Sequence, residues 1–563
     1  MNEQRNLTLA VVLAILILMG FHYLYERPRQ IAQSHEIATQ TPQASPVTVP
    51  TQAPTSPQAT QLNRPEALVA SKRIPIKNQQ LHGSINVQGG ILDDIALINY
   101  HETPESNSSE ILLLSPRQSK TSYFCEFNWL GNGQKLPNIQ TIWEQKGKEL
   151  TPDTPIVLSY NNGEGLVFER TFSIDNQFMF QIKERVVNNG RSPVSLKPCT
   201  QIMRQGTPQT GGYFILHEGP LGVINKKLVE YDYQKLLDKS SIEQTSTGGW
   251  IGITDKYWLV ALIPPQNGTV NMWFRGEKSH PDPRYITGFS GPTLDIQPGE
   301  SVEYTYHMFA GAKKLHMLDK YEKQLNVQKF DLAVDFGWFY FLTKPLFYVL
   351  EFLNALLGNL GVAILALTII FKAVMYPLAA KSFRSMAQMK KFQPQMEKLK
   401  ERYKDDKLKL QQEIMELYRK EKINPLSGCL PIVIQAPIFF CLYKVLFVTI
   451  EMRHAPFFGW IHDLSAPDPT TIFNLFGLLP WTPPGFLMIG VWPILMGLTM
   501  YLQQKLNPQP ADPAQAKALL FMPVFLTFLL AQFPAGLVIY WAWTNILGIT
   551  QQWLMLRAHK TSS

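Results

Sequence analysis

A single lysine, Lys372, lies within the apolar stretch 360–378. A stretch of this length is typical of a membrane-spanning helix, and a charge inside a bilayer is costly enough to suggest a function. The alternative is that the side chain snorkels, because Lys372 is only about six residues, roughly 9 Å, from the end of the stretch. The position alone leaves both explanations open.

Other polar side chains lie within apolar stretches and could line one wet cavity together with Lys372. Thr368 precedes Lys372 by one helical turn, so the two share a helix face. Gln435 lies midway along the stretch 426–449. Taken singly, each is better explained by an interhelical hydrogen bond worth ~0.6–2 kcal/mol. Near the C-terminus two pairs share a helix face in the same way, Tyr540 with Thr544 and Trp541 with Asn545.

The apolar blocks of the chain predict six membrane spans. The first block, 7–25, is longer than the apolar region of a cleaved signal peptide and has no A-x-A-like site, so we expect an uncleaved signal anchor. The last block, 518–556, would extend ~58 Å as one helix and is divided at Pro534 and Gly536. The predicted spans are 7–25, 360–379, 426–449, 485–503, 518–533 and 536–556.

The distribution of Lys and Arg predicts the orientation of these spans. The segment 380–424 carries 13 Lys and Arg against 7 Asp and Glu, whereas Arg453 is the only Lys or Arg in 451–484. Because Lys and Arg concentrate on the cytoplasmic side, the first segment and both termini are expected there. The formal net charge of +8 then reflects membrane topology. It favours anionic lipids or ribosomal RNA as partners and argues against DNA.

Composition divides the chain further. Residues 1–27 hold the signal anchor, and 28–65, rich in Pro, Gln, Thr and Ser, read as a disordered tether. Short alternating stretches over 66–325 predict a large external all-β sandwich domain. Residues 337–359 predict an amphipathic helix in the external interface, with one longer tilted span over 346–371 as the alternative.

The charged segment 380–424 predicts a helical hairpin that projects into the cytoplasm. Apolar residues recur at spacings of three and four on both sides of a polar turn, which is typical of two helices with facing seams. The residues of the two seams are Met389, Phe392, Met396, Leu399 and Tyr403, followed by Leu410, Ile414 and Leu417.

The sequence contains none of the motifs that we would expect of a nucleotide-dependent or hydrolytic enzyme. There is no G-x-x-x-x-G-K-[ST], no G-x-S-x-G and no H-E-x-x-H, and the 11 His show no metal-ligand spacing. We therefore expect no enzymatic activity, no cofactor and no metal. Cys125 and Cys199 could pair in the external domain. Lys444, near the external end of the third span, is expected to snorkel.

Five ordered stretches resemble the YidC family of membrane protein insertases of Gram-negative bacteria, and the resemblance runs over nearly the whole chain. It implies a core of five spans, within 360–563, around a hydrophilic groove open to cytoplasm and lipid and closed externally. The basic residue of that groove, usually Arg, corresponds to Lys372. The stretches are Thr368–Leu378, Asn424–Pro431, Gln435–Phe439, Ile461–Ser465 and Phe533–Leu537.

The same resemblance implies roles for individual residues. Thr368, Lys372, Gln435 and Asn545 would line the groove. A substrate helix would contact the residues Ala436, Pro437, Phe439, Tyr540 and Trp541. The implied partners are nascent membrane proteins, the ribosome and the Sec translocon.

Three hypotheses about function follow. The first is a membrane protein insertase and chaperone of the bacterial inner membrane that uses no nucleotide. The second is a secondary transporter with Lys372 as an ion or substrate site, although the sequence shows no internal repeat. The third is a saccharide or ligand receptor formed by the external domain. Lys372 beside Thr368 in a span that matches the insertase groove favours the first.

Overall fold

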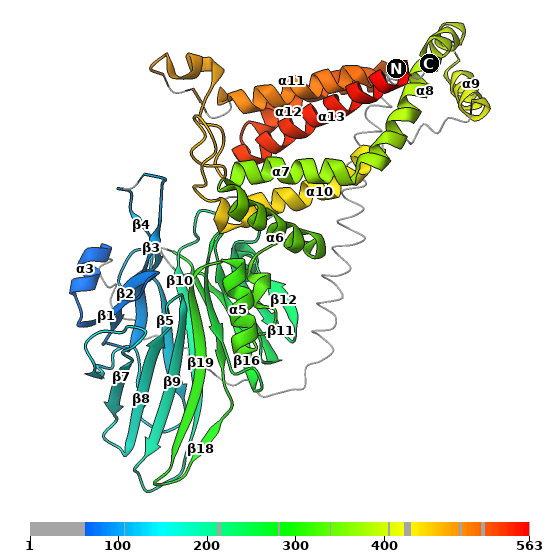
Figure 1. Ribbon diagram of the computed structural model, residues 1–563. Helices are drawn as coiled ribbons and strands as arrows, with labels where there is room; N and C mark the ends of the chain where they lie inside the picture. Colours follow the sequence, from blue (N-terminus) through cyan, green and yellow to red (C-terminus); the bar gives the residue numbers. More distant parts are fainter. Residues whose placement is uncertain are drawn as a thin grey trace.

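The computed structural model describes residues 62–561 except 106, 211–215, 280–281, 338, 404–405, 422–429, 482, 485–486 and 508–512. The expected signal anchor and most of the expected tether 28–65 lie outside the described residues. The end of that tether is structured, because the short helix α3 (Arg64–Val69) begins within it, with Pro65 in a first helical turn that suits proline. Two parts follow: a β domain (residues 62–336) and a helical core (residues 340–561), placed end to end in Figure 1.

Alternating apolar side chains build the β domain, as β8 shows with buried residues at every second position. The predicted all-β domain is confirmed as two antiparallel sheets. In the described residues the first sheet contains β1 (Arg73–Lys77), β2 (Leu81–Asn86), β3 (Ile91–His101), β4 (Glu110–Leu114), β5 (Tyr123–Leu130), β10 (Val194–Gln205), β13 (Ser241–Thr247), β16 (Thr269–Glu277), β17 (Arg284–Ser290) and β18 (Leu294–Ile296). The second contains β6 (Glu144–Lys146), β7 (Ile156–Asn161), β8 (Leu166–Ile174), β9 (Met179–Asn188), β11 (Gly219–Ile224), β12 (Lys227–Glu230), β14 (Trp250–Thr254), β15 (Trp258–Ile263) and β19 (Ser301–Ala312).

The two sheets pack face to face through aromatic side chains. Phe127 of the first sheet meets Phe172 of the second edge-on, with ring centroids 5.5 Å apart. An ion pair is buried between them: Nε of Arg170 donates to Oε1 of Glu184 at 2.6 Å, and the guanidinium also donates to the carbonyl of Gly90 at 2.9 Å. Both charged side chains are almost fully buried. The sandwich therefore depends on a satisfied charge pair as well as on apolar burial.

Cys125 and Cys199 are free thiols in this domain. They lie on the neighbouring strands β5 and β10, but Cys125 is opposite Ile202 and Cys199 is opposite Asn128. The pairing that the sequence left open does not occur, because the register offsets the two residues by three positions.

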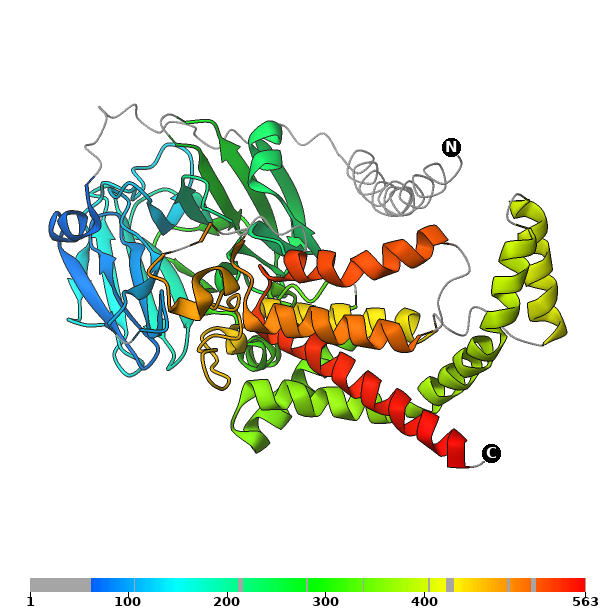
Figure 2. The same cartoon turned by 90° about the horizontal axis from the view of Figure 1, so that it is seen from above.

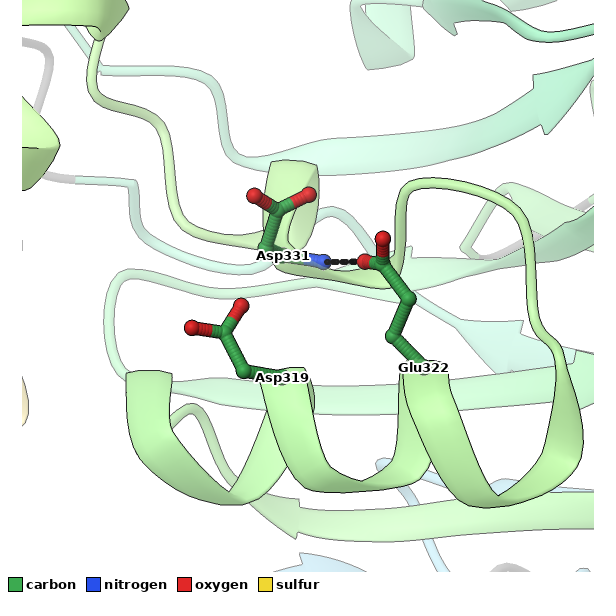
Figure 3. A group of neighbouring side chains, drawn as sticks. All are labelled: Asp319, Glu322 and Asp331. Atoms are coloured by element: carbon green, nitrogen blue, oxygen red, sulfur yellow. Dashed lines mark hydrogen bonds between the residues drawn. The ribbon is translucent and has the colours of Figure 1, made fainter.

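The helix α5 (Leu315–Leu325) and the turn η2 (Phe330–Ala333) connect the sandwich to the core. Figure 3 shows three carboxylates gathered there, from Asp319, Glu322 and Asp331. Nζ of Lys344 donates to Asp319 at 2.9 Å and to Asp331 at 2.5 Å. This lysine supplies the positive charge of the cluster and binds the first core helix, α6 (Tyr340–Leu357), to the β domain.

Helix α6 occupies the region where the sequence predicted an interfacial helix over 337–359. It ends at Gly358, whose φ of 70° is left-handed, and Asn359 then caps the next helix by accepting a hydrogen bond from the Val362 amide. The alternative of one continuous helix over 346–371 is therefore wrong. The reason is local, because Gly358 ends one helix and the adjacent Asn359 caps the next.

The rest of the core contains α7 (Leu360–Val374), α8 (Tyr376–Arg402), α9 (Lys407–Lys420), α10 (Leu430–Val448), α11 (Val491–Leu506), α12 (Pro513–Leu530) and α13 (Ala535–Thr561), with 3₁₀ turns η4 (Ile450–Met452) and η5 (Ile472–Gly477) between α10 and α11. Seen from above, α8 and α9 form a hairpin that extends away from the β domain (Figure 2). Met396 and Ile414 are buried in it, and the hydroxyl of Tyr418 donates to Sδ of Met396 at 3.3 Å.

The stretch expected as one span over 360–379 bends by 60° between α7 and α8. The break falls at Met375, and Pro377 occupies the first turn of α8, where its missing N–H costs nothing. Among the described helices, none alone has both the length and the apolar content needed to cross a bilayer; α7 with Tyr376–Arg384 meets that criterion only as a bent pair. The expected number of six spans remains a prediction.

Candidate functional site

Three helices that are far apart in the sequence bring the expected polar residues together. Helix α7 carries Thr368 and Lys372, α10 carries Gln435, and α13 carries Tyr540 and Thr544. Helix α13 packs against both α7 and α10, and α8 continues from the end of α7 (Figure 1). All five residues line one cavity of about 150 Å³.

The lining of this cavity is mixed, with neutral polar groups on most sides. Lys372 is the only charged residue among the described residues that line it. The apolar part comes mainly from α7 and α8, on both sides of the bend. The lining residues are Thr368, Phe371, Lys372, Met375, Leu378, Ala379, Phe383, Gln435, Ile438, Gln503, Asn507, Tyr540, Thr544, Gly548, Gln551 and Gln552.

Lys372 is partly buried and makes no ion pair with a carboxylate in the part of the chain that the structure describes. The hydrogen-bonded polar side chains near Lys372 are neutral. Nε2 of Gln551 donates to the Lys372 carbonyl at 3.4 Å, and Nε2 of Gln552 donates to Oδ1 of Asn507 at 2.9 Å. The positive charge of Lys372 is thus not neutralised from within the described residues.

The cavity is suited to water. Oε1 of Gln552 is buried and accepts no hydrogen bond from the described protein atoms. A buried polar atom without a protein partner is costly, and a water molecule in a polar cavity of this size is the usual way to satisfy it. Thr368, in contrast, is already satisfied, because its hydroxyl donates to the Ile364 carbonyl at 2.7 Å.

Asn545, which the sequence places in the groove, is not among the lining residues. Its Nδ2 donates to Oγ1 of Thr499 at 3.2 Å and to the Met496 carbonyl at 3.4 Å, so it joins α13 to α11. The physical reason is helical periodicity: the step from Thr544 to Asn545 turns the side chain by about 100° around the helix.

The residues expected to contact a substrate helix lie beside the cavity. Phe439 packs against Trp541 with ring centroids 4.8 Å apart and stacks on Tyr540 at 6.3 Å. Ala436 and Pro437 are partly buried on the same helix as Phe439. Tyr540 is the only one of these five that also lines the cavity.

Sequence reasoning missed four polar residues of the lining, Gln503, Asn507, Gln551 and Gln552. A signal for them was present. Gln551 and Gln552 continue the face of Tyr540 and Thr544 at helical spacing, and Gln503 and Asn507 are one turn apart near the end of α11. What the sequence could not supply is the contact between α11 and α13 that brings these faces together.

Two family models match the chain: the model described as 60Kd inner membrane protein at residues 352–562, and the YidC periplasmic domain at residues 73–349. The boundary between them falls within α6.

Curated relatives match over almost the full length. "Membrane protein insertase YidC" of Methylorubrum extorquens is 46% identical, with 99% of this chain and 95% of the relative covered. Proteins with the same name from Methylobacterium nodulans and Brucella suis are 47% and 46% identical, with 99% of this chain covered and 95% and 96% of those proteins. A solved YidC insertase structure covers 85% of this chain and 92% of its own at 19% identity and a TM-score of 0.36. On the family models and the full-length relatives, the chain belongs to the YidC family of membrane protein insertases.

Proposed function

We propose that this chain inserts membrane proteins into the bacterial inner membrane and assists their folding, and that the cavity of Lys372 is part of the groove that receives the substrate. The observation that carries the proposal is Lys372, which among the described lining residues is the one cation and which pairs with no carboxylate of the described chain, between α7, α10 and α13. Such a site favours polar, and especially acidic, segments without holding them in one geometry.

The energetics need no nucleotide. Moving a short polar segment through hydrocarbon is costly, and a wet cavity that spans part of the bilayer lowers that cost. An acidic side chain in the groove is attracted to Lys372 by about 4 kcal/mol at 4 Å for an effective dielectric constant of about 20. The apolar helix that follows gains about 25 cal/mol per Å² as it moves into lipid, which drives the process forward.

The residues divide into two groups. Thr368, Lys372 and Gln435 would contact the polar segment. Phe439, Tyr540 and Trp541, with Ala436 and Pro437, would guide the apolar helix, because the three aromatic side chains form a cluster in which Tyr540 also lines the cavity. Asn545 supports this arrangement through its bonds to α11.

The proposal includes the topology inferred from charge. Six spans place both termini and the hairpin α8–α9 on the cytoplasmic side, where the ribosome, the Sec translocon and anionic lipids are the proposed partners. The β domain lies at the opposite end of the core in Figure 1, in keeping with this orientation. The relatives named above are insertases and lend no support to the transporter alternative.

The test is insertion by the purified chain in liposomes without nucleotide. The substrate is a small single-span protein with a short acidic external segment, and protease protection measures its insertion. We expect a clear gain over empty liposomes. A chain without residues 66–325 should keep most of that gain, whereas a receptor function of the β domain predicts its loss. No gain for the full chain would refute the proposed function.

A further inference from the structure

An apolar loop lies between α10 and α11, at the end of the core nearest the β domain. We define the aromatic loop as residues Thr471–Trp481. Apolar side chains along it are 40% to 82% exposed. These residues are Phe473, Leu475, Phe476, Leu478, Leu479 and Trp481.

The exposure does not come from a loose chain, because the loop is hydrogen-bonded internally and at its base. The buried Thr471 donates its hydroxyl to the Leu487 carbonyl at 2.9 Å and accepts the Phe476 amide on its own carbonyl at 2.9 Å. The Ile472 amide donates to the Ile489 carbonyl at 3.2 Å. Many backbone polar groups of the loop are thus satisfied from within, which lowers the cost of placing it in an apolar environment.

Two consecutive bulky residues of the loop adopt a backbone conformation that L-amino acids avoid. Leu475 has φ 52° and Phe476 has φ 58°, both in the left-handed region. Strain of this kind persists where the surrounding structure enforces it, and it is concentrated at functional positions. Here the strained residues, Leu475 and Phe476, have side chains that are exposed rather than packed in a core.

The base of the loop is anchored to the core by Asp468. Its buried carboxylate accepts hydrogen bonds from Nε1 of Trp460 at 3.1 Å and from the Trp492 amide, at the start of α11, at 2.9 Å. A carboxylate at a helix N-terminus is favourably placed. The loop therefore has a fixed position relative to α11.

The surroundings indicate which environment covers the loop. Arg453, which precedes it, donates to the carbonyl of His101 in the β domain, so the loop belongs to the periplasmic end of the core. No charged residue occurs between Asp468 and Lys505. Such a segment, uncharged and with exposed Phe and Trp, is typical of the membrane–water interface, where aromatic rings are enriched. The segment offers no charged group through which a protein partner could be recognised specifically.

We propose that the aromatic loop inserts into the periplasmic-side interface of the bilayer and anchors the start of α11 there. The partner is the lipid bilayer itself, at the boundary between headgroups and acyl chains. The loop and α11 then form one lipid-contacting surface, since Asp468 holds the base of the loop against the start of α11. This inference does not rest on the role proposed for Lys372.

The test compares two exposed apolar positions by nitroxide labelling and EPR. Leu478, which is 82% exposed at the loop, and Val69, which is 86% exposed on α3 of the β domain, are each changed to Cys and labelled. The full chain is reconstituted in liposomes of zwitterionic and anionic phospholipids. The labelled unsubstituted chain serves as the blank, because the free cysteines that the structure describes are buried. Relaxation by oxygen, which concentrates in lipid, is compared with relaxation by a water-soluble nickel chelate present on both sides.

We expect the label of Leu478→Cys to be relaxed more by oxygen than by the nickel chelate, and that of Val69→Cys to show the reverse. Equal access of the nickel chelate to both labels would overturn the proposal. A Leu478→Cys label shielded from both reagents would indicate a protein on the loop, such as a second copy of the chain, and would also overturn it. Insertion activity in the same liposomes checks that both variants are folded.

Discussion

Lys444 of α10 forms an ion pair with Asp335, which lies between η2 and α6, with Nζ 3.0 Å from Oδ2. The same Nζ donates to the Asp335 carbonyl at 3.2 Å. The sequence predicts that Lys444, near the end of an apolar stretch, snorkels toward water. In the structure a carboxylate of the β domain supplies its counter-charge. Together with the bonds of Lys344, this pair ties the β domain to the helical core at two points.

Replacing Lys444 should weaken that connection. Lys444→Met leaves the Asp335 carboxylate, whose side chain is 21% exposed, without its cation, and we expect a loss of about 1–3 kcal/mol in unfolding free energy. Equilibrium unfolding of the full chain in detergent measures it. The control is Lys183→Met, which breaks the exposed pair with Glu303 and should cost less than about 1 kcal/mol. Equal losses in the two variants would contradict the role of the pair.

The charge of Lys372 should matter for acidic substrates. Lys372→Arg keeps the charge and should insert them normally, whereas Lys372→Gln should lower their rate of insertion by about tenfold, the equivalent of about 1.4 kcal/mol. Protease protection in liposomes gives the rates. The same substrate with its acidic residues changed to amides is the control and should insert equally well with all three chains. Normal insertion of the acidic substrate by Lys372→Gln would argue against the proposed groove charge.

Asn545→Ala should behave differently, because Asn545 bonds to α11 and does not line the cavity. We expect a loss of core stability of about 0.6–1.7 kcal/mol, as for other interhelical hydrogen bonds. Insertion of acidic and amide substrates should fall by the same factor. A loss confined to acidic substrates would return Asn545 to the groove, as the sequence alone suggests.

Burial lowers the pKa of Lys313 from its ordinary value near 10.5 to about 8, although carboxylates such as Asp335 act in the opposite direction. Its Nζ donates to Oγ1 of Thr254 at 2.8 Å. The folded chain releases this proton before the unfolded chain does. Between pH 8 and 10.5 the unfolded state therefore holds more protons, and the contribution of Lys313 to stability rises with pH.

The corresponding experiment follows unfolding of the wild type and Lys313→Met from pH 7.5 to 10.5. The wild type should gain about 2–3 kcal/mol relative to the variant across this range. The exposed Lys183→Met serves again as a control and should show no such trend. A constant difference between wild type and Lys313→Met would show that the folded chain keeps the proton.

The buried pair of Arg170 and Glu184 should be the most sensitive point of the sandwich. Arg170→Met leaves Glu184 charged and uncompensated between the sheets, and we expect a loss of about 3–5 kcal/mol in unfolding free energy. Arg185→Met, on the neighbouring strand and paired with Glu169 near the surface, should cost less than about 1 kcal/mol. If Arg170→Met were as mild as the control, the interior of the sandwich would have to admit water.

The sequence predicted the β domain well, because alternation along single strands is a local property. It also brought Thr368, Lys372, Gln435, Tyr540 and Thr544 to notice, because polar residues are conspicuous in apolar stretches. All five line the same cavity in the structure.

What the sequence could not supply were relations between distant elements. The resemblance implies a place for Asn545 in the groove, but its hydrogen bonds depend on where α11 packs. The bend at Met375 depends on Pro377, whose effect on the direction of a helix is not visible in apolar content. The counter-charges of Lys344 and Lys444 come from the β domain, which no periodicity within the helices could reveal.

The bend at Met375 has a mechanical consequence. Lys372 and Phe371 line the cavity on one side of the bend, and Leu378, Ala379 and Phe383 line it on the other. The first turns of α8 thus form part of the cavity wall, and the rest of α8 continues from them into the hairpin α8–α9. A rotation of α8 about Met375 therefore moves part of the cavity wall, so a force on the far end of the hairpin changes the shape of the cavity.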